Sequence, residues 1–136
     1  MSDQRPRASI DINADMGESF GRWQLGNDAA LMPHLSSANI GCGFHGGDPH
    51  VMRATIRLAK QHGVGVGAHV SLPDRLGFGR RQMAISAQEL KDYVIYQVGA
   101  LQAFAAAEGA RVAHVKPHGA LYVMCMQNEV YARAVV

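Results

Sequence analysis

Four short segments of this chain alternate between apolar and polar side chains, and this alternation limits the folds open to it. The segments are residues 8–13, 38–42, 64–69 and 112–116. Successive side chains of a strand point to opposite faces, so each segment predicts a strand with two unlike faces. The side chains predicted for the apolar face are Ile10, Ile12, Ala14, Ile40, Cys42, Phe44, Val64, Val66, Ala68, Ala113, Val115 and Pro117. Those predicted for the other face are Asp11, Asn13, Asp15, Asn39, Gly41, Gly43, His45, Gly65, Gly67, His69, His114, Lys116 and His118.

Helix signals lie between these segments. Asp48 precedes Pro49 as a capping carboxylate, and a helix is expected from there to Gly63. Ser86 and Glu89 form a capping box that opens a helix ending near Gly109. A shorter helix is expected over residues 27–33, and a last one begins between residues 119 and 128 and still runs at the C-terminus. Strands alternating with helices in this way are typical of βαβ units and a parallel sheet.

The polar strand face narrows the fold class. A buried parallel sheet is normally apolar on both faces, whereas a barrel can hold a polar site in its lumen near the strand ends. We therefore expect an α/β fold, specifically a (β/α) barrel of the glycoside hydrolase or deacetylase type. A whole barrel needs about 250 residues, but this chain has 136 residues. Residues 8–136 are expected to form only the N-terminal part of one barrel domain, after a disordered leader at residues 1–7, with pairing to another copy as an option.

The polar face also collects candidate catalytic groups. A lysine in a strand is costly to bury unless it is paired or used, and Asp11 and Asp15 are available partners for Lys116. Asp15, His45 and His69 follow three adjacent strands and could hold a divalent cation. Without a metal, the same groups could act as general acid and base, and the sequence leaves both options open.

Other polar residues have plainer alternatives. Asp11 and Asn13 also fit an exposed edge strand, and His45 fits a glycine-rich turn. A structural, hydrogen-bonded role is favoured for His114. The loop at residues 77–81 holds two arginines that could close over an anionic substrate, although a solvated turn explains them equally well.

Composition excludes several function classes. The formal net charge is only +2, which argues against a nucleic-acid partner or a polybasic membrane patch. No apolar run approaches the roughly 18 residues of a membrane span. The two cysteines, Cys42 and Cys125, suit a reducing compartment, so a cytoplasmic enzyme is expected. The sequence has neither a serine nucleophile elbow nor a Walker phosphate loop.

Several motifs together resemble the LamB/YcsF family, whose members are described as the A subunit of 5-oxoprolinase. The stretches that carry the resemblance are residues 11–18, 37–49, 67–69, 77–81 and 114–122. The resemblance implies ATP-dependent opening of the lactam of 5-oxo-L-proline to L-glutamate, shared with two partner subunits that help to handle ATP. It also implies an incomplete or distorted (β/α) barrel.

On this hypothesis the catalytic residues are Asp15 or His45, which activates water, and Lys116 and His118, which steady the tetrahedral intermediate. The residues expected to bind substrate are Asp11, Asn13, Asn39, His69, Arg80 and Arg81, with either arginine holding the substrate carboxylate. Two alternatives stay open, namely a metal-dependent amidohydrolase related to deacetylases and a non-catalytic subunit that binds a small acid.

Overall fold

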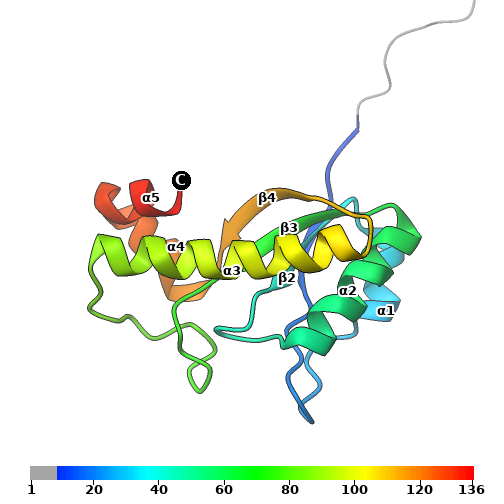
Figure 1. Ribbon diagram of the computed structural model, residues 1–136, viewed down its shortest axis with the longest axis horizontal. Helices are drawn as coiled ribbons and strands as arrows, with labels where there is room; N and C mark the ends of the chain where they lie inside the picture. Colours follow the sequence, from blue (N-terminus) through cyan, green and yellow to red (C-terminus); the bar gives the residue numbers. More distant parts are fainter. Residues whose placement is uncertain (1–8) are drawn as a thin grey trace, which may run out of the picture.

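Four parallel strands form one open sheet in the computed structural model, which describes residues 9–136 (Figure 1). The strands are β1 (Asn13–Met16), β2 (Ser37–Gly41), β3 (Gly65–Val70) and β4 (Val112–Pro117), and they neighbour one another in chain order. The predicted α/β fold with a parallel sheet is confirmed. The sheet of the described residues does not close on itself, so the barrel stays a prediction. The predicted leader at residues 1–7 lies outside the described residues.

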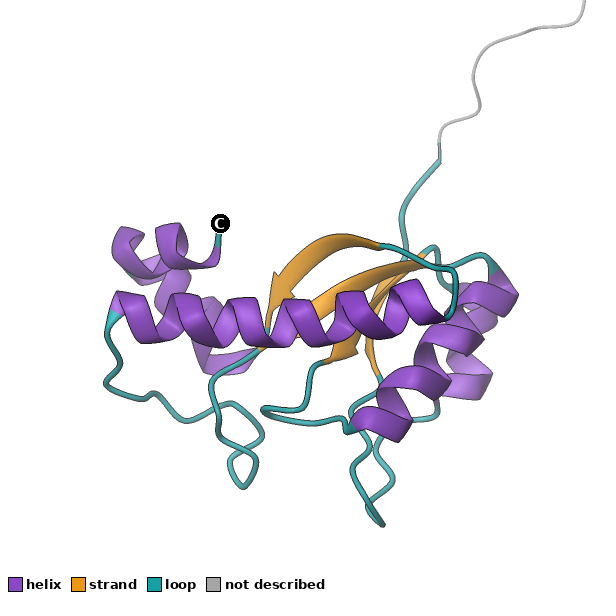
Figure 2. Ribbon diagram, in the orientation of Figure 1, coloured by secondary structure: helices purple, strands orange, loops and turns teal. Residues whose placement is uncertain are grey.

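Helices connect the strands and cover one face of the sheet, with α3 running across it in Figure 2. The helical elements are α1 (Asp28–Leu31), the 3₁₀ turn η1 (Met32–His34), α2 (Pro49–His62), α3 (Ala87–Ala107), α4 (Gly119–Gln127) and α5 (Glu129–Val135). Asp48 caps α2 as predicted, and the capping box of Ser86 and Glu89 opens α3. Among the described residues, no helix combines the length and the apolar character needed to cross a membrane.

The last helix differs from the prediction. The single expected helix is two helices, because Asn128 adopts extended backbone angles and ends α4. The Asn128 side chain then accepts a hydrogen bond from the backbone N–H of Val130 and so caps α5. Asn128 therefore both ends α4 and begins α5.

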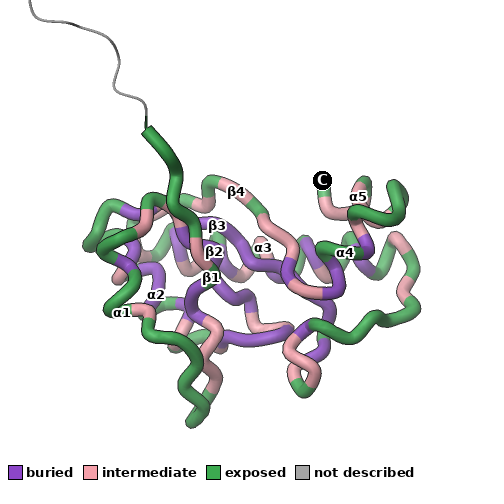
Figure 3. The backbone as a smooth tube through the Cα atoms, turned by 180° about the vertical axis from the view of Figure 1, so that it is seen from behind, coloured by how far each residue is buried: buried purple, intermediate pink, exposed green. Residues whose placement is uncertain are grey.

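The strand register confirms the division into two faces. Asp15 pairs with Asn39, Asn39 with Gly67, and Gly67 with His114, so these residues lie on one face of the sheet. The opposite face packs on the helices, and its core includes fully buried Ile40. Other fully buried core side chains are Met16, Ile56, Leu72, Leu90, Leu101 and Leu121. Figure 3, which views the molecule from behind, shows that burial is deepest along β2 and β3.

Several residues assigned to the apolar face are exposed, including Ala113 and Val115 of β4. Ile10 is 85% exposed and Ile12 is 54% exposed. The predicted strand at residues 8–13 was wrong in its bounds, because β1 begins only at Asn13. The pairing of β3 with β4 also shifts between Val66 and Gly67, which leaves Ala113 outside the regular alternation.

One buried amide joins α3 to the end of β3. The Gln97 side chain accepts a hydrogen bond from the Ser71 N–H at 2.8 Å and donates to the Ser71 carbonyl at 2.9 Å. It also donates to the Tyr93 carbonyl at 2.9 Å. Gln97 is completely buried. The amide therefore completes the hydrogen bonding of the backbone at the point where the chain leaves the sheet.

Replacing Gln97 with leucine is expected to destabilise the protein, because the buried N–H and C=O of Ser71 would lose their partners. Each unsatisfied buried group costs about 1–3 kcal/mol. Urea unfolding measures the loss, and Gln102→Leu on the exposed side of the same helix is the control. Equal unfolding midpoints for the two variants would contradict this role.

Candidate functional site

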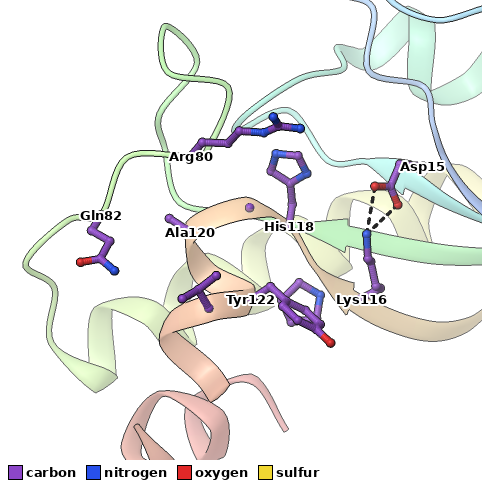
Figure 4. A pocket seen from close by; sticks show the side chains of 10 residues that line it. Asp15, Arg80, Gln82, Lys116, His118, Ala120 and Tyr122 are labelled. Carbon is purple, nitrogen blue, oxygen red and sulfur yellow. Dashed lines mark hydrogen bonds and ion pairs between the residues drawn. The ribbon is translucent and has the colours of Figure 1, made fainter. Parts of the chain in front are cut away.

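The carboxyl ends of the strands border an open cleft of about 650 Å³ (Figure 4). Asp15 reaches it from β1, and Lys116 and His118 reach it from the end of β4. Arg80 from the loop after β3 and Tyr122 from α4 form other walls. Ligands of parallel α/β folds bind at this edge of the sheet, so the cleft lies where the sequence placed the site.

A charged pair crosses the polar face beside the cleft. The Lys116 ammonium lies 2.8 and 2.9 Å from the two carboxylate oxygens of Asp15. The Asp15 carboxylate also accepts a hydrogen bond from Asn39 at 2.8 Å and lies 3.2 Å from the His69 ring. Burial opposes ionisation of Asp15, but the neighbouring His69, Lys116 and Asn39 outweigh it and hold the pKa of Asp15 well below its usual range. Asp15 is therefore the carboxylate partner of Lys116.

Three of the predicted substrate-binding residues do not line the cleft and hydrogen-bond to other protein groups. Asn13 and Asn39 bond to each other through both side-chain amides, and the His114 ring donates to Asn39 at 2.7 Å. Asp11 accepts hydrogen bonds from the hydroxyls of Ser36 and Ser37. The structural role favoured for His114 agrees with this network, and the structure does not bring Asp11, Asn13 or Asn39 to the cleft wall.

Deeper than the charged pair, three histidines gather around one carboxylate. Glu18, His45, His69 and His118 each offer one donor atom, and these four atoms lie within 4.8 Å of one another. The three rings are nearly or fully buried, and the rings of His45 and His118 stack with their centroids 3.8 Å apart. Burial and the neighbouring His45 lower the pKa of His118 to about 4, and burial also lowers the pKa of His45. These four residues, called the His/Glu cluster below, have donor types that could hold a metal ion.

Glu18 is the functional candidate that the sequence reasoning missed. The expected group of Asp15, His45 and His69 contains two of the three histidines, but the carboxylate that lies near all three rings is Glu18, whereas Asp15 contacts only His69. The Oε1 atom of Glu18 lies 2.8 Å from His45 and 3.7 Å from both His69 and His118. Glu18 could have been identified as a candidate from its position shortly after the strand that carries Asp15.

Backbone carbonyls hold two of the rings. His69 Nδ1 lies 2.9 Å from the Lys116 carbonyl, and His118 Nε2 lies 2.7 Å from the Phe78 carbonyl. A carbonyl only accepts hydrogen bonds, so each of these nitrogens carries the proton. The other nitrogens, His69 Nε2 and His118 Nδ1, face each other at 2.9 Å.

The loop after β3 closes against this cluster. Asp74 is buried and accepts hydrogen bonds from the Gly77 N–H and from the Arg81 backbone and guanidinium. These bonds lower the pKa of Asp74 to about 2, and the bond from the Arg81 side chain has the largest effect. Arg81 is therefore committed to Asp74, whereas Arg80 lines the cleft with its guanidinium 5.5 Å from the Phe78 ring centre.

Phe78 and Gly79 form the tightest part of this loop. Phe78 has φ +53°, a left-handed conformation unusual for an aromatic residue, and this turn aims its carbonyl at His118. A Cβ at Gly79 would lie 2.8 Å from both His118 and His45 and would also collide with the Ser71 hydroxyl. The absence of a side chain at Gly79 lets the loop backbone lie directly on the histidines.

Replacing Gly79 with alanine tests this close approach. Gly21 is the matched control, because it also has a left-handed φ (+53° against +64°), but a Cβ added there would meet nothing within 4 Å. Both substitutions carry the conformational cost of about 1–2 kcal/mol. Gly79→Ala is expected to lose about 1–3 kcal/mol more through overpacking. Urea unfolding measures both, and equal losses would contradict the predicted contact.

Comparisons with known proteins identify a family and a solved structure that are similar to this chain. Residues 10–136 match the LamB/YcsF family. The A subunit of 5-oxoprolinase from Bordetella pertussis is 58% identical over 127 residues, which cover 93% of this chain and 50% of that protein. The A subunit of 5-oxoprolinase from Pyrococcus horikoshii is 56% identical with the same coverage. The crystal structure of a lactam utilization protein from Thermus thermophilus superposes with a TM-score of 0.93 at 52% identity, covering 94% of this chain and 52% of that one.

The chain thus spans about half the length of the curated relatives it matches. The family match extends through every strand and helix described above. The chain belongs to the LamB/YcsF family.

Proposed function

We propose that this chain acts in the ring opening of 5-oxo-L-proline to L-glutamate, as the counterpart of the A subunit of a 5-oxoprolinase. The observation that carries the proposal is the cleft itself, in which Lys116, His118 and Arg80 meet in a chain that belongs to this family. The names of the relatives indicate a subunit, and the proposed assembly includes two partner subunits.

The reaction needs activation, because a five-membered lactam is an unreactive amide. We assign this activation to ATP, whose terminal phosphoryl group is transferred to the lactam oxygen and makes the ring carbon electrophilic. Water adds to that carbon, the C–N bond breaks with a proton passing to nitrogen, and a second water hydrolyses the resulting acyl phosphate. The sequence has no Walker phosphate loop, so ATP binding is assigned to the assembly with its partners.

Lys116 is the group best placed to stabilise negative charge on the reacting oxygen. Its side chain is 37% exposed beside the cleft, and Asp15 orients the ammonium from behind. The depressed pKa of Asp15 makes it a weak base, so Asp15 holds Lys116 instead of taking a proton from water. His45 is buried and bonded to Glu18, so we assign water activation to the His/Glu cluster as a unit.

Arg80 is the arginine assigned to the substrate carboxylate. A guanidinium binds a carboxylate through paired hydrogen bonds, and Arg80 lines the cleft while Arg81 is held by Asp74. The Phe78 ring supports the Arg80 guanidinium, which keeps it over the loop that closes on the histidines.

The His/Glu cluster also favours a second candidate function, a metal-dependent amidohydrolase that acts on an amide without ATP. Three imidazoles and one carboxylate are typical ligands of hydrolytic metal sites. The two functions differ in their requirement, because only the first needs ATP and partner subunits for glutamate release.

Replacing Lys116 with methionine should reduce glutamate release from 5-oxoproline about 100- to 1,000-fold, because one donor to the reacting oxygen is lost. The assay combines the chain with its two partner subunits and ATP. Lys91→Met, on the exposed surface of α3, is the matched control and should leave the rate unchanged.

A Lys116→Met rate close to that of Lys91→Met would contradict the role of Lys116. Glutamate release without ATP would favour the amidohydrolase. Binding of 5-oxoproline by calorimetry with no glutamate release by the complete assembly would instead indicate a non-catalytic binding subunit.

A further inference from the structure

We propose that Glu18, His45, His69 and His118 bind one divalent transition-metal ion, and that Zn²⁺ is the ion these donors favour. Three imidazole nitrogens and one carboxylate oxygen match the ligand types of zinc, whereas magnesium and calcium prefer oxygen ligands. The proposal goes beyond the ring-opening function and does not depend on it.

The spacing of the donor atoms fits one small ion. Metal–ligand bonds of about 2.0–2.1 Å in a tetrahedron place neighbouring donors roughly 3.3–3.4 Å apart. Glu18 Oε1 lies 2.8 Å from His45 Nε2, 3.7 Å from His69 Nε2 and 3.7 Å from His118 Nδ1. His69 Nε2 lies 2.9 Å from His118 Nδ1. These four separations fall on both sides of the tetrahedral spacing, and all six lie within 4.8 Å, so the site forms once the side chains move closer around one ion.

The protonation pattern of the rings supplies an independent reason for a cation. Because their outer nitrogens donate to the carbonyls of Lys116 and Phe78, the inner nitrogens of neutral His69 and His118 carry lone pairs. His69 Nε2 therefore faces three acceptors, namely His118 Nδ1 at 2.9 Å, Asp15 at 3.2 Å and Glu18 at 3.7 Å. Lone pairs at this distance repel one another, and a positive charge between them converts the repulsion into attraction.

The surroundings resemble the outer layer of a metal site. Metal-binding histidines usually donate their second ring N–H to a carbonyl or carboxylate, which fixes the ring orientation. His69 and His118 both do so. His45 differs, because its Nδ1 has no hydrogen-bond partner among the described residues, and its ring instead stacks on His118 and meets Phe78 edge-on.

The site would be reached from the cleft. The side chains of His45 and His69 are fully buried and that of His118 is 5% exposed, whereas the Glu18 side chain is 16% exposed. A ligand or water could therefore approach the ion from the side of Glu18 and His118, where His118 also lines the cleft. The competing explanation is that a single proton converts one ring to an imidazolium. A measurement of metal binding distinguishes a bound ion from this proton.

The test uses the full chain without a histidine tag, stripped of metal with a chelator. Co²⁺ titration followed by visible absorption reports the coordination, and elemental analysis after dialysis against Zn²⁺ reports the stoichiometry. One equivalent of Zn²⁺ and the intense absorption bands of four-coordinate Co²⁺ are expected. Less than a stoichiometric amount of bound metal, or only the weak bands of six-coordinate Co²⁺, would overturn the proposal and favour the shared proton.

Two cluster variants and one control locate the bound ion. Glu18→Gln and His118→Ala should each weaken Zn²⁺ binding by more than the roughly 10- to 100-fold typical of losing an outer-layer partner. His62→Ala, at the exposed end of α2, is the matched control and should bind as the unmodified chain does. Unchanged affinity in both cluster variants would place the ion elsewhere and refute the assignment. If circular dichroism shows that a variant is unfolded, the Co²⁺ spectrum of the unmodified chain decides the question.

Discussion

The hydrogen bond from the His69 ring to the Lys116 carbonyl is the interaction on which the site depends. It joins β3 to β4 through a side chain, since the two residues are register partners. The bond directs the other ring nitrogen of His69 toward Glu18 and His118, and the Lys116 side chain extends to Asp15. One bond between neighbouring strands thus orients both the charged pair and the His/Glu cluster.

The rest of the fold holds this arrangement in place. The helices bury the apolar face of the sheet, and Gln97 completes the hydrogen bonds of Ser71 where β3 leaves the sheet. The following loop is organised by Asp74 and returns over the histidines, where the Phe78 carbonyl holds His118. The loop therefore orients the His118 ring through a backbone carbonyl, as β4 orients the His69 ring. The two carbonyls come from segments distant in sequence, and only the folded chain brings them together.

Strand alternation predicted the most informative part of the structure. The parity that placed Asp15, His69 and Lys116 on one face depends only on the two-residue period of a strand, which the register confirms. The start of β1 was predicted too early, because Ile10 and Ile12 continue the alternation beyond the residues that pair with β2. An alternating pattern does not show where a neighbouring strand ends.

Details that depend on turns were harder to predict. Asp11 and Asp15 share a face, so parity alone could not decide which one meets Lys116. Arg80 and Arg81 are adjacent in a loop, and of their two guanidinium groups Asp74 binds only that of Arg81. This contact depends on how the loop folds, which the sequence pattern does not show. Glu18 lies beyond the end of β1, where strand alternation no longer predicts the direction of a side chain.

The central claim is that backbone carbonyls fix the protonation pattern of the buried histidines and leave a centre that requires positive charge. The most direct measurement is a long-range ¹H–¹⁵N NMR spectrum of the metal-stripped chain with ¹⁵N-labelled histidine. We expect Nδ1 to carry the proton in His69 and Nε2 to carry it in His118. The opposite tautomers, with the protons on the nitrogens that face each other, would contradict the claim.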